Sequence, residues 1–243
     1  MNTATQTLLD AKGLRAWYGA AQILFDLDLQ VGRGEVVALM GRNGAGKSTT
    51  LKAIMGMLDK RRGDIRFLGH DISRSEPYQA ARLGLAFVPE DRRVFTDLTV
   101  MENLAVGRQP PRGDGRGAPE WTPERLFKLF PNLGEMPQRP GGRMSGGEQQ
   151  MLTVARALMG NPYLVLLDEP SEGVAPVIVE QMANMILELK ASGVSILLSE
   201  QNMHFAELVS DRAYVLEKGQ IRYHATMQEL ADNEEVRRAY LSV

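Results

Sequence analysis

The chain has 243 residues, of which 44% are hydrophobic and 24% charged, a composition that suits one domain with a sizeable core. The formal net charge of -2 provides no basic field for nucleic acid, so no nucleic-acid partner is expected. The absence of cysteine excludes disulfides, thiolate metal sites and cysteine nucleophiles. The N-terminus lacks the basic start and apolar stretch of a signal peptide, and no apolar run approaches the ~18 residues of a membrane span.

The first third of the chain predicts several strands. Residues 1–7 are polar and are expected to form a loose tail. Apolar and polar residues alternate over Phe25–Val31, which predicts a half-buried strand. The unbroken apolar run Val36–Met40 predicts a fully buried strand, and Ile65–Leu68 predicts another short one. This third therefore mixes antiparallel strands with one strand of the buried, parallel type.

A glycine-rich loop follows the buried strand and opens a helix-like run to Met57. Its nine residues are Gly41, Arg42, Asn43, Gly44, Ala45, Gly46, Lys47, Ser48 and Thr49. The spacing is that of the phosphate-binding P-loop, in which glycines let backbone N–H groups turn toward an anion. We expect Lys47 to reach the outer phosphates of a nucleotide and Ser48 to hold Mg²⁺. A plain glycine turn between strand and helix is the alternative.

The middle of the chain changes character. Gly107–Pro119 is rich in Pro, Gly and Arg and is expected to be a surface loop with solvated arginines. Thr122 precedes Pro and an acid, which predicts a helix start, and Pro131 ends that helix. Leu98–Pro140 is interpreted as a mostly helical lobe, and the inserted lobe as a whole covers roughly residues 95–158 of a single domain spanning 1–243.

The last third returns to alternating strands and helices. In order, it predicts a buried strand at Tyr163–Leu167, an amphipathic helix at Val177–Lys190, a buried strand at Val194–Ser199, a hairpin of Tyr214–Leu216 with Ile221–Tyr223, and a C-terminal helix begun by a Thr226–Glu229 capping box. Buried strands that alternate with helices predict a parallel sheet. Ligands of such sheets bind at the carboxyl ends of the strands, where the P-loop also lies.

Two adjacent acids, Asp168 and Glu169, close one of the buried strands. Phosphoryl transfer from a nucleotide needs a metal ion held in place and a water oriented for attack. We expect Asp168 to hold Mg²⁺ and Glu169 to act as the general base. Taken without the P-loop, the pair would equally fit two solvated acids at the start of a loop.

Ser145 and Glu148 stand three residues apart before an apolar run, which predicts a capping box at a helix start. The capping box does not explain Gly146 and Gly147 in the first turn, where each glycine costs about 1 kcal/mol relative to Ala. Glycines there are expected if a phosphate must approach the backbone.

Together, GRNGAGKST, MSGGEQQ and LVLLDEP resemble the ATP-binding subunits of ABC transporters, in order and over nearly the whole chain. The resemblance implies an α/β fold: a P-loop NTPase core with a parallel sheet, an N-terminal antiparallel β subdomain and an inserted helical subdomain. It implies that two such domains pair head to tail around ATP and Mg²⁺. Ser145, Gly146 and Gly147 would then touch ATP held by the partner, Tyr18 would lie against adenine, and residues 170–176 would cross the dimer interface.

Two positions depart from the general family pattern. Glu90 stands where most members have Gln, and Gln201 stands where most have His. A Gln amide can donate to a phosphate but carries no proton charge near neutral pH. Glu90 would add a third carboxylate, which could bind Mg²⁺ more strongly or be driven toward protonation by like charge. Both alternatives stay open. The two departures, Glu90 and Gln201, put the rate of ATP hydrolysis at this site in question.

The segments VPEDRRVF, PSEGVAP, SEQN and VRRAYLSV resemble the LivF-type subunit of branched-chain amino-acid importers. That resemblance implies a peripheral ATPase at the cytoplasmic face of the inner membrane. Its partners would be a second, different ATPase subunit, or a copy of itself when isolated, two membrane permease subunits and, indirectly, a periplasmic binding protein. The alternatives are a urea or amide importer ATPase, a mainly regulatory ATP-binding subunit, a soluble ABC ATPase and, least favoured, another P-loop enzyme such as a kinase.

Overall fold

The computed structural model describes residues 6–113 and 117–241. The strands are β1 (Thr7–Tyr18), β2 (Ala21–Gly32), β3 (Val36–Met40), β4 (Lys60–Phe67), β5 (His70–Asp71), β6 (Leu85–Val88), β7 (Leu164–Asp168), β8 (Ser195–Glu200), β9 (Arg212–Glu217) and β10 (Gln220–Thr226). The helices are α1 (Lys47–Met55), α2 (Pro77–Leu83), α3 (Val100–Gly107), α4 (Pro123–Leu129), α5 (Pro131–Gly134), the 3₁₀ helix η1 (Gly141–Arg143), α6 (Gly146–Leu158), α7 (Pro176–Ala191), α8 (Met203–Val209), α9 (Met227–Asp232) and α10 (Glu234–Tyr240).

The described strands form two sheets. The larger has the order β10-β9-β3-β8-β7-β6, in which β9, β3, β8, β7 and β6 run parallel and β10 is an antiparallel edge. The smaller sheet, β2-β1-β4-β5, is antiparallel throughout. Every residue of β3, β7 and β8 is buried, as expected for strands covered on both faces.

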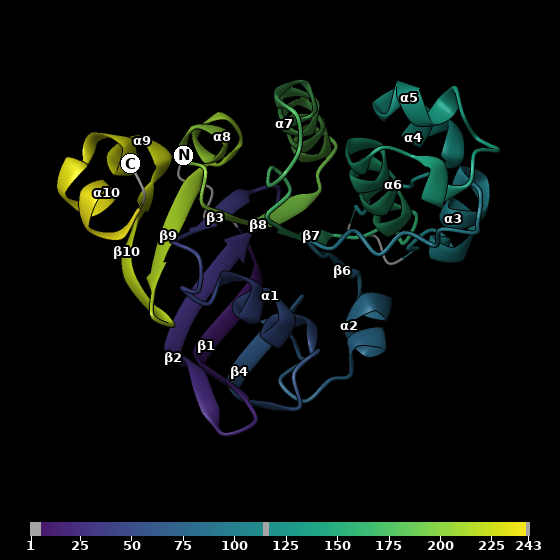
Figure 1. Ribbon diagram of the computed structural model, residues 1–243. Coiled ribbons are helices and arrows are strands. Elements are labelled where there is room, and N and C mark those ends of the chain that lie inside the picture. Colours follow the sequence, from purple (N-terminus) through teal and green to yellow (C-terminus); the bar gives the residue numbers. More distant parts are fainter. Residues whose placement is uncertain (1–5, 114–116, 242–243) are drawn as a thin grey trace.

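Helix α1 lies between the two sheets and contacts strands of both, while α7 and α8 cover the opposite face of the parallel sheet (Figure 1). Helices α3 to α6 form a lobe beside the β6 edge (Figure 1). The lobe shares one apolar core with the α7 face of the sheet, to which α6 contributes Leu152, Val154 and Ala155. No helix among residues 6–113 and 117–241 is long and apolar enough to cross a membrane.

Most elements predicted from periodicity are confirmed. The strand Val36–Met40 has the expected bounds, and the strands predicted in the last third differ from β7 and β8 by one residue at each end. Side-chain caps predicted at Thr122, Ser145 and Thr226 are all made. The C-terminal helix is divided in two, because Asn233 leaves the helical conformation and caps α10 through its side chain.

The N-terminal tail and two strands were predicted less well. Thr7 belongs to β1 and not to the expected loose tail, and residues 1–5 lie outside the described part. The long strand β1 and the short strand β6 were not predicted. Bulges interrupt the alternation of β1, and β6 has only four residues, so neither gives a clear period.

The loop between α3 and α4 contradicts the expectation of solvated arginines. Arg108 is exposed, and Arg116 lies outside the described residues. The guanidinium of Arg112, however, donates to the carbonyls of Ala81 and Arg82 at the end of α2, and to those of Gly160 and Asn161 after α6, over 2.6–3.2 Å. Carbonyls at helix ends lack partners within the helix, so a cation that binds them joins the lobe to the core.

We predict that Arg112→Ala lowers the free energy of unfolding by about 2 kcal/mol, the scale of hydrogen bonds made by a charged group. Arg112→Lys should recover only part of this loss, because an ammonium cannot present the planar fork that reaches two helix ends. Urea denaturation followed by circular dichroism measures the change. The matched control is Arg108→Ala in the same loop, expected within about 0.5 kcal/mol of the parent. Equal losses for both alanine variants would contradict the structural role.

Candidate functional site

The register of the parallel sheet brings the ends of three strands to one level. Met40 of β3 pairs with Glu200 of β8, and Ser199 of β8 pairs with Asp168 of β7. The residues that follow these strands therefore meet at one edge of the sheet. They are the P-loop after β3, Glu169 after β7 and Gln201 after β8. Segments more than one hundred residues apart in sequence thus form one site.

The P-loop has the backbone that its glycines allow. Gly44 and Gly46 have φ angles of 78° and 112°, in the region that residues with a Cβ rarely adopt. Gly46 is the N-cap of α1, so the first N–H groups of the helix point into the loop. Asn43 and Gly44 are exposed, whereas Ala45 and Thr49 are buried against the core. The loop is therefore shaped to bind an anion such as phosphate.

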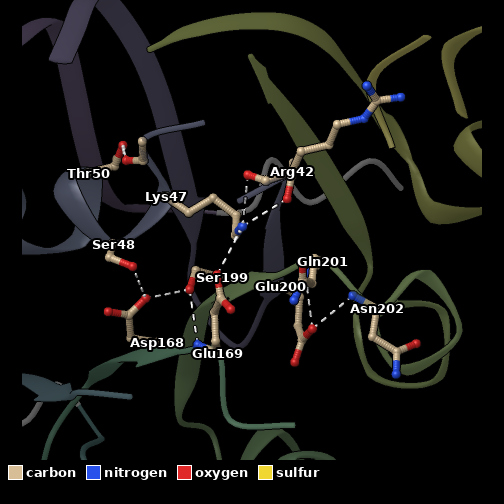
Figure 2. A network of polar contacts seen from close by, with 12 residues as sticks. Arg42, Lys47, Ser48, Thr50, Asp168, Glu169, Ser199, Glu200, Gln201 and Asn202 are labelled. Carbon is tan, nitrogen blue, oxygen red and sulfur yellow. Dashed lines mark hydrogen bonds and ion pairs between the residues drawn. The ribbon is translucent and has the colours of Figure 1, made fainter. Parts of the chain in front are cut away.

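Lys47 is buried and its ammonium is already occupied by chain groups. It lies 2.9 Å from Oε1 of Glu169 and donates to the carbonyls of Gly41, at 2.8 Å, and Arg42, at 3.3 Å (Figure 2). Glu169 adopts a left-handed φ of 44°, uncommon for a residue with a side chain. Such backbone strain clusters at functional sites, where the surrounding structure holds it in place.

Asp168 joins the P-loop to β8. Its Oδ1 accepts hydrogen bonds from the hydroxyls of Ser48, at 2.9 Å, and Ser199, at 2.7 Å (Figure 2). Burial raises the pKa of Asp168, while these two hydrogen bonds act in the opposite direction. Ser199 also accepts the backbone N–H of Glu169, so it fixes both acids of the pair.

The oxygen atoms of Ser48 and Asp168 are the hard donors that Mg²⁺ prefers. Within the described residues, no group of three or more His, Asp or Glu is arranged to hold a metal by itself. Mg²⁺ commonly binds through one or two protein oxygens, with phosphates and water completing its shell, so the pair fits this ion.

Glu90 and Gln201 lie at the same edge of the sheet. Val88, the last residue of β6, pairs with Leu167 of β7. Glu90 and Glu169 each come two residues later, so both leave the sheet at the same level. Glu90 is exposed, and Gln201 is half-buried directly after β8.

Ser145, Gly146 and Gly147 begin α6 away from the P-loop. Among the described residues, no hydrogen bond or ion pair links this segment to residues 41–49. A Cβ on Gly146 would approach Arg92 to 2.7 Å, and one on Gly147 would approach Ile178 to 2.7 Å. Ile178 packs directly over Gly147, whereas the neighbour of Gly146 is the guanidinium at the end of the flexible Arg92 side chain, which can move aside. Packing within the chain therefore accounts for Gly147 without a ligand, but it does not account for Gly146.

Tyr18 and Arg42 are placed at the rim. Tyr18 ends β1 in the antiparallel sheet and is 48% exposed, which leaves its ring accessible. The backbone of Arg42 belongs to the P-loop, but its guanidinium points toward the C-terminal helix and makes long contacts of 3.4 Å with the carbonyls of Arg238 and Leu241.

Sequence reasoning missed three polar residues at this edge, namely Ser199, Glu200 and Glu172. The signal for the first two is a polar pair that follows an apolar run in a buried strand, since burying polar groups there requires partners. Glu172 carries no such signal because it is exposed in a loop.

The pKa values of Glu172 and Glu169 depend on each other. Burial by itself raises the pKa of Glu169, but hydrogen bonds from Glu172 and Lys47 hold it below its ordinary value. The hydrogen bond to Glu169, partial burial and the Glu169 charge raise the pKa of Glu172 from 4.5 to about 7, and the Glu90 charge adds to this. Near neutral pH, Glu172 is therefore partly protonated and donates to Glu169.

This shift predicts a pH dependence of stability. Because the pKa of Glu172 is higher in the folded chain, its proton stabilises the fold fully below pH 4.5, and this contribution is lost as the pH rises through about 7. Glu172→Gln removes the titration, so the variant should gain stability relative to the parent over that interval. The gain should be small, since the side chain is exposed to solvent. Melting temperatures at several pH values measure it, and parallel curves for both proteins would refute it.

Comparison with known proteins bears on this geometry. The family model described as ABC transporter matches residues 24–172. The branched-chain amino acid transport ATP-binding protein BraG of Pseudomonas aeruginosa is 44% identical over 96% of this chain and 99% of its own length. The lipopolysaccharide export ATP-binding protein LptB of Escherichia coli is 34% identical over 96% of both chains.

The fold agrees with solved structures. A nucleotide-free ATP-binding cassette from an ABC transporter matches with a TM-score of 0.81 at 27% identity, covering 98% of this chain and all of the other. The expected ABC ATPase fold, with a mainly parallel sheet, an antiparallel β subdomain and a helical lobe, is therefore confirmed. Because the family model covers more than half of the chain and a close relative covers nearly all of it, this chain belongs to the ATP-binding ATPase subunits of ABC transporters.

Proposed function

We propose that this chain hydrolyses ATP to power an importer of branched-chain or other hydrophobic amino acids. The observation that carries the hydrolytic assignment is the buried pair of Lys47 and Glu169, which joins the phosphate-binding loop to the acid after β7. BraG, which is named for branched-chain amino acid transport, is 44% identical to this chain, whereas LptB, which is named for lipopolysaccharide export, is 34% identical. The higher identity supports amino acids as the transported class. In this proposal residues 1–243 act as one domain, with the helical lobe at roughly 95–158 inserted in the nucleotide-binding core.

In the proposed mechanism the N–H groups of Gly44–Lys47 bind phosphate oxygens, aided by the positive end of α1. Lys47 exchanges the Glu169 carboxylate and two backbone carbonyls for the outer phosphates of ATP. This exchange frees Glu169 to accept a proton from the attacking water. Tyr18 stacks on the adenine, a role that its exposed ring allows.

Ser48 and Asp168 would hold Mg²⁺, which when bound supplies positive charge that offsets the charge of the phosphates. Because the Ser48 hydroxyl donates its hydrogen to Asp168, its oxygen lone pairs would remain available to the ion. Ser199 keeps its hydrogen bond to Asp168 and so fixes the orientation of the carboxylate. Glu90 contributes a third carboxylate at this edge, and Gln201 donates its amide to the γ-phosphate.

The site is completed by a second subunit. Ser145–Gly147 reach the ATP held by that subunit, and its corresponding segment closes the site of this chain. The partner is a different ATPase subunit in the assembled importer, and a second copy serves when the chain is isolated. The pair lies at the cytoplasmic face of the cell membrane beneath two permease subunits, to which a periplasmic binding protein delivers the substrate.

An apolar groove beside the lobe is the proposed docking surface for a permease subunit. It lies between the α1–α2 region and the lobe and is lined by Met57, Tyr78, Phe95 and Val106, whose side chains are 37–57% exposed. Large apolar side chains gathered on a surface mark interaction sites.

A mainly regulatory role for this subunit is the second candidate. Gln201 favours it, because an amide cannot carry a proton charge to the phosphates near neutral pH. In that case the partner subunit performs most of the hydrolysis. Comparing turnover after the Glu169→Gln change with turnover after the matching change in the partner separates the two candidates.

We predict that Glu169→Gln, assayed in the cognate complex, lowers steady-state hydrolysis by about 10²- to 10⁴-fold, the usual contribution of a general base. ATP binding should persist, because the phosphates replace the carboxylate that Lys47 loses. Glu188→Gln, an exposed change on α7, is the matched control. Normal hydrolysis by the Glu169 variant would refute the assignment.

Gln201, directly after β8, can be tested in the same complex. If the absence of an ionisable group limits this site, Gln201→His should raise steady-state hydrolysis by about tenfold or more. The comparison is made at equal, saturating ATP in the same complex. An unchanged or reduced rate would show that Gln201 is not limiting.

A further inference from the structure

Glu200 is a buried acid to which neither the mechanism above nor the sequence motifs give a role. It is the last residue of β8, pairs with Met40 of β3, and is 1% exposed. A carboxylate is rarely buried to this extent unless it is paired or hydrogen-bonded, because the loss of hydration is costly. No cation lies within ion-pair distance of it among the described residues.

Its partners are instead neutral donors on two separate loops. Oε1 accepts from the hydroxyl of Ser171 at 2.5 Å and from its backbone N–H at 3.3 Å. Oε2 accepts from the backbone N–H groups of Gln201 and Asn202, both at 3.0 Å (Figure 2). One oxygen therefore binds the loop after β7, and the other binds the loop after β8.

The chemistry of these contacts requires a carboxylate. All four partners are donors, and an ionised carboxylate is the side chain that offers only acceptors. Burial raises the pKa of Glu200 above its ordinary value, and the hydrogen bonds from Ser171, Asn202 and Gln201 limit that rise because they favour the ionised form. A side-chain amide of the same size would turn its NH₂ group toward donors on one of the two loops.

The two loops carry the residues on which turnover depends. Ser171 lies two positions after Glu169, and Gln201 directly follows Glu200. By holding both loops, the Glu200 carboxylate fixes Gln201 relative to Glu169. Ser199 adds a second tie between the same segments, because its carbonyl and hydroxyl both accept the N–H of Glu169.

We propose that Glu200 is a positioning residue that fastens the loop after the catalytic acid to the loop bearing Gln201, and that ATP turnover depends on this link. Glu200 itself does not touch the nucleotide. The inference rests on the proposed function, since it assumes that Glu169 and Gln201 act on ATP.

The test is Glu200→Gln in the full chain assembled with its cognate partners. We expect kcat for ATP hydrolysis to fall about 10- to 100-fold, because small misplacements of reacting groups are that costly. The dissociation constant for ATP, measured with a non-hydrolysable analogue, should stay within about twofold, because the P-loop is untouched. A role in folding alone would instead lower the melting temperature and leave kcat per folded molecule unchanged.

A milder pair of variants keeps the test independent of folding. Ser171→Ala removes one branch of the link at a half-buried position and should lower kcat, while Ser171→Thr keeps the hydroxyl and should restore it. Combined with Glu200→Gln, Ser171→Ala should add little, because both changes break the same link. The matched control is Ser210→Ala, which removes a buried hydroxyl without a hydrogen-bond partner and should leave kcat unchanged.

Normal kcat in both Glu200→Gln and Ser171→Ala would overturn the proposal, as would additive losses in the double variant. Glu169→Gln in the same assay keeps the two hypotheses apart. If it abolishes turnover while the Glu200 and Ser171 variants are normal, only the positioning role fails. If Glu169→Gln hydrolyses ATP normally, the proposed function fails with it.

Discussion

The parallel register of β3, β8 and β7 is the constraint on which the site depends. It sets Met40 beside Glu200 and Ser199 beside Asp168, so that three loops leave the sheet at one level. In a parallel sheet the hydrogen bonds fix this alignment, and a shift of one residue would turn every side chain of a strand to the opposite face. The position of the P-loop relative to the acids is thus a property of the core.

Buried polar groups at this edge satisfy one another across strand boundaries. Asp168 accepts from Ser48 and Ser199, and Glu169 pairs with Lys47. Glu200 accepts hydrogen bonds from the loop after β7 and from the loop after β8. Because each unpaired group would be costly, the groups form connected clusters and cannot move independently. In the proposed mechanism, a nucleotide entering this edge replaces the partners of Lys47, and phosphate binding thereby releases Glu169.

In the proposed function, a second subunit completes the nucleotide site at this edge of the sheet. Ser145–Gly147 begin α6 in the lobe and share no hydrogen bond with the P-loop within the described residues. The Ile178 side chain fills the space that a side chain on Gly147 would need, and the Arg92 guanidinium lies over Gly146. The lobe is in turn held to the core by Arg112 at two helix ends, so its placement is a matter of tertiary contacts.

The sequence by itself determined the elements with a strong local period or an end signal, such as the strand Val36–Met40, the P-loop and the capping boxes at Ser145 and Thr226. These patterns are local, so they can be recognised without knowledge of the fold. Only the tertiary structure decided the pairing of Lys47 with Glu169, the bridging role of Glu200 and the docking of Arg112. Those contacts join segments far apart in the chain, and no local spacing encodes which strands become neighbours.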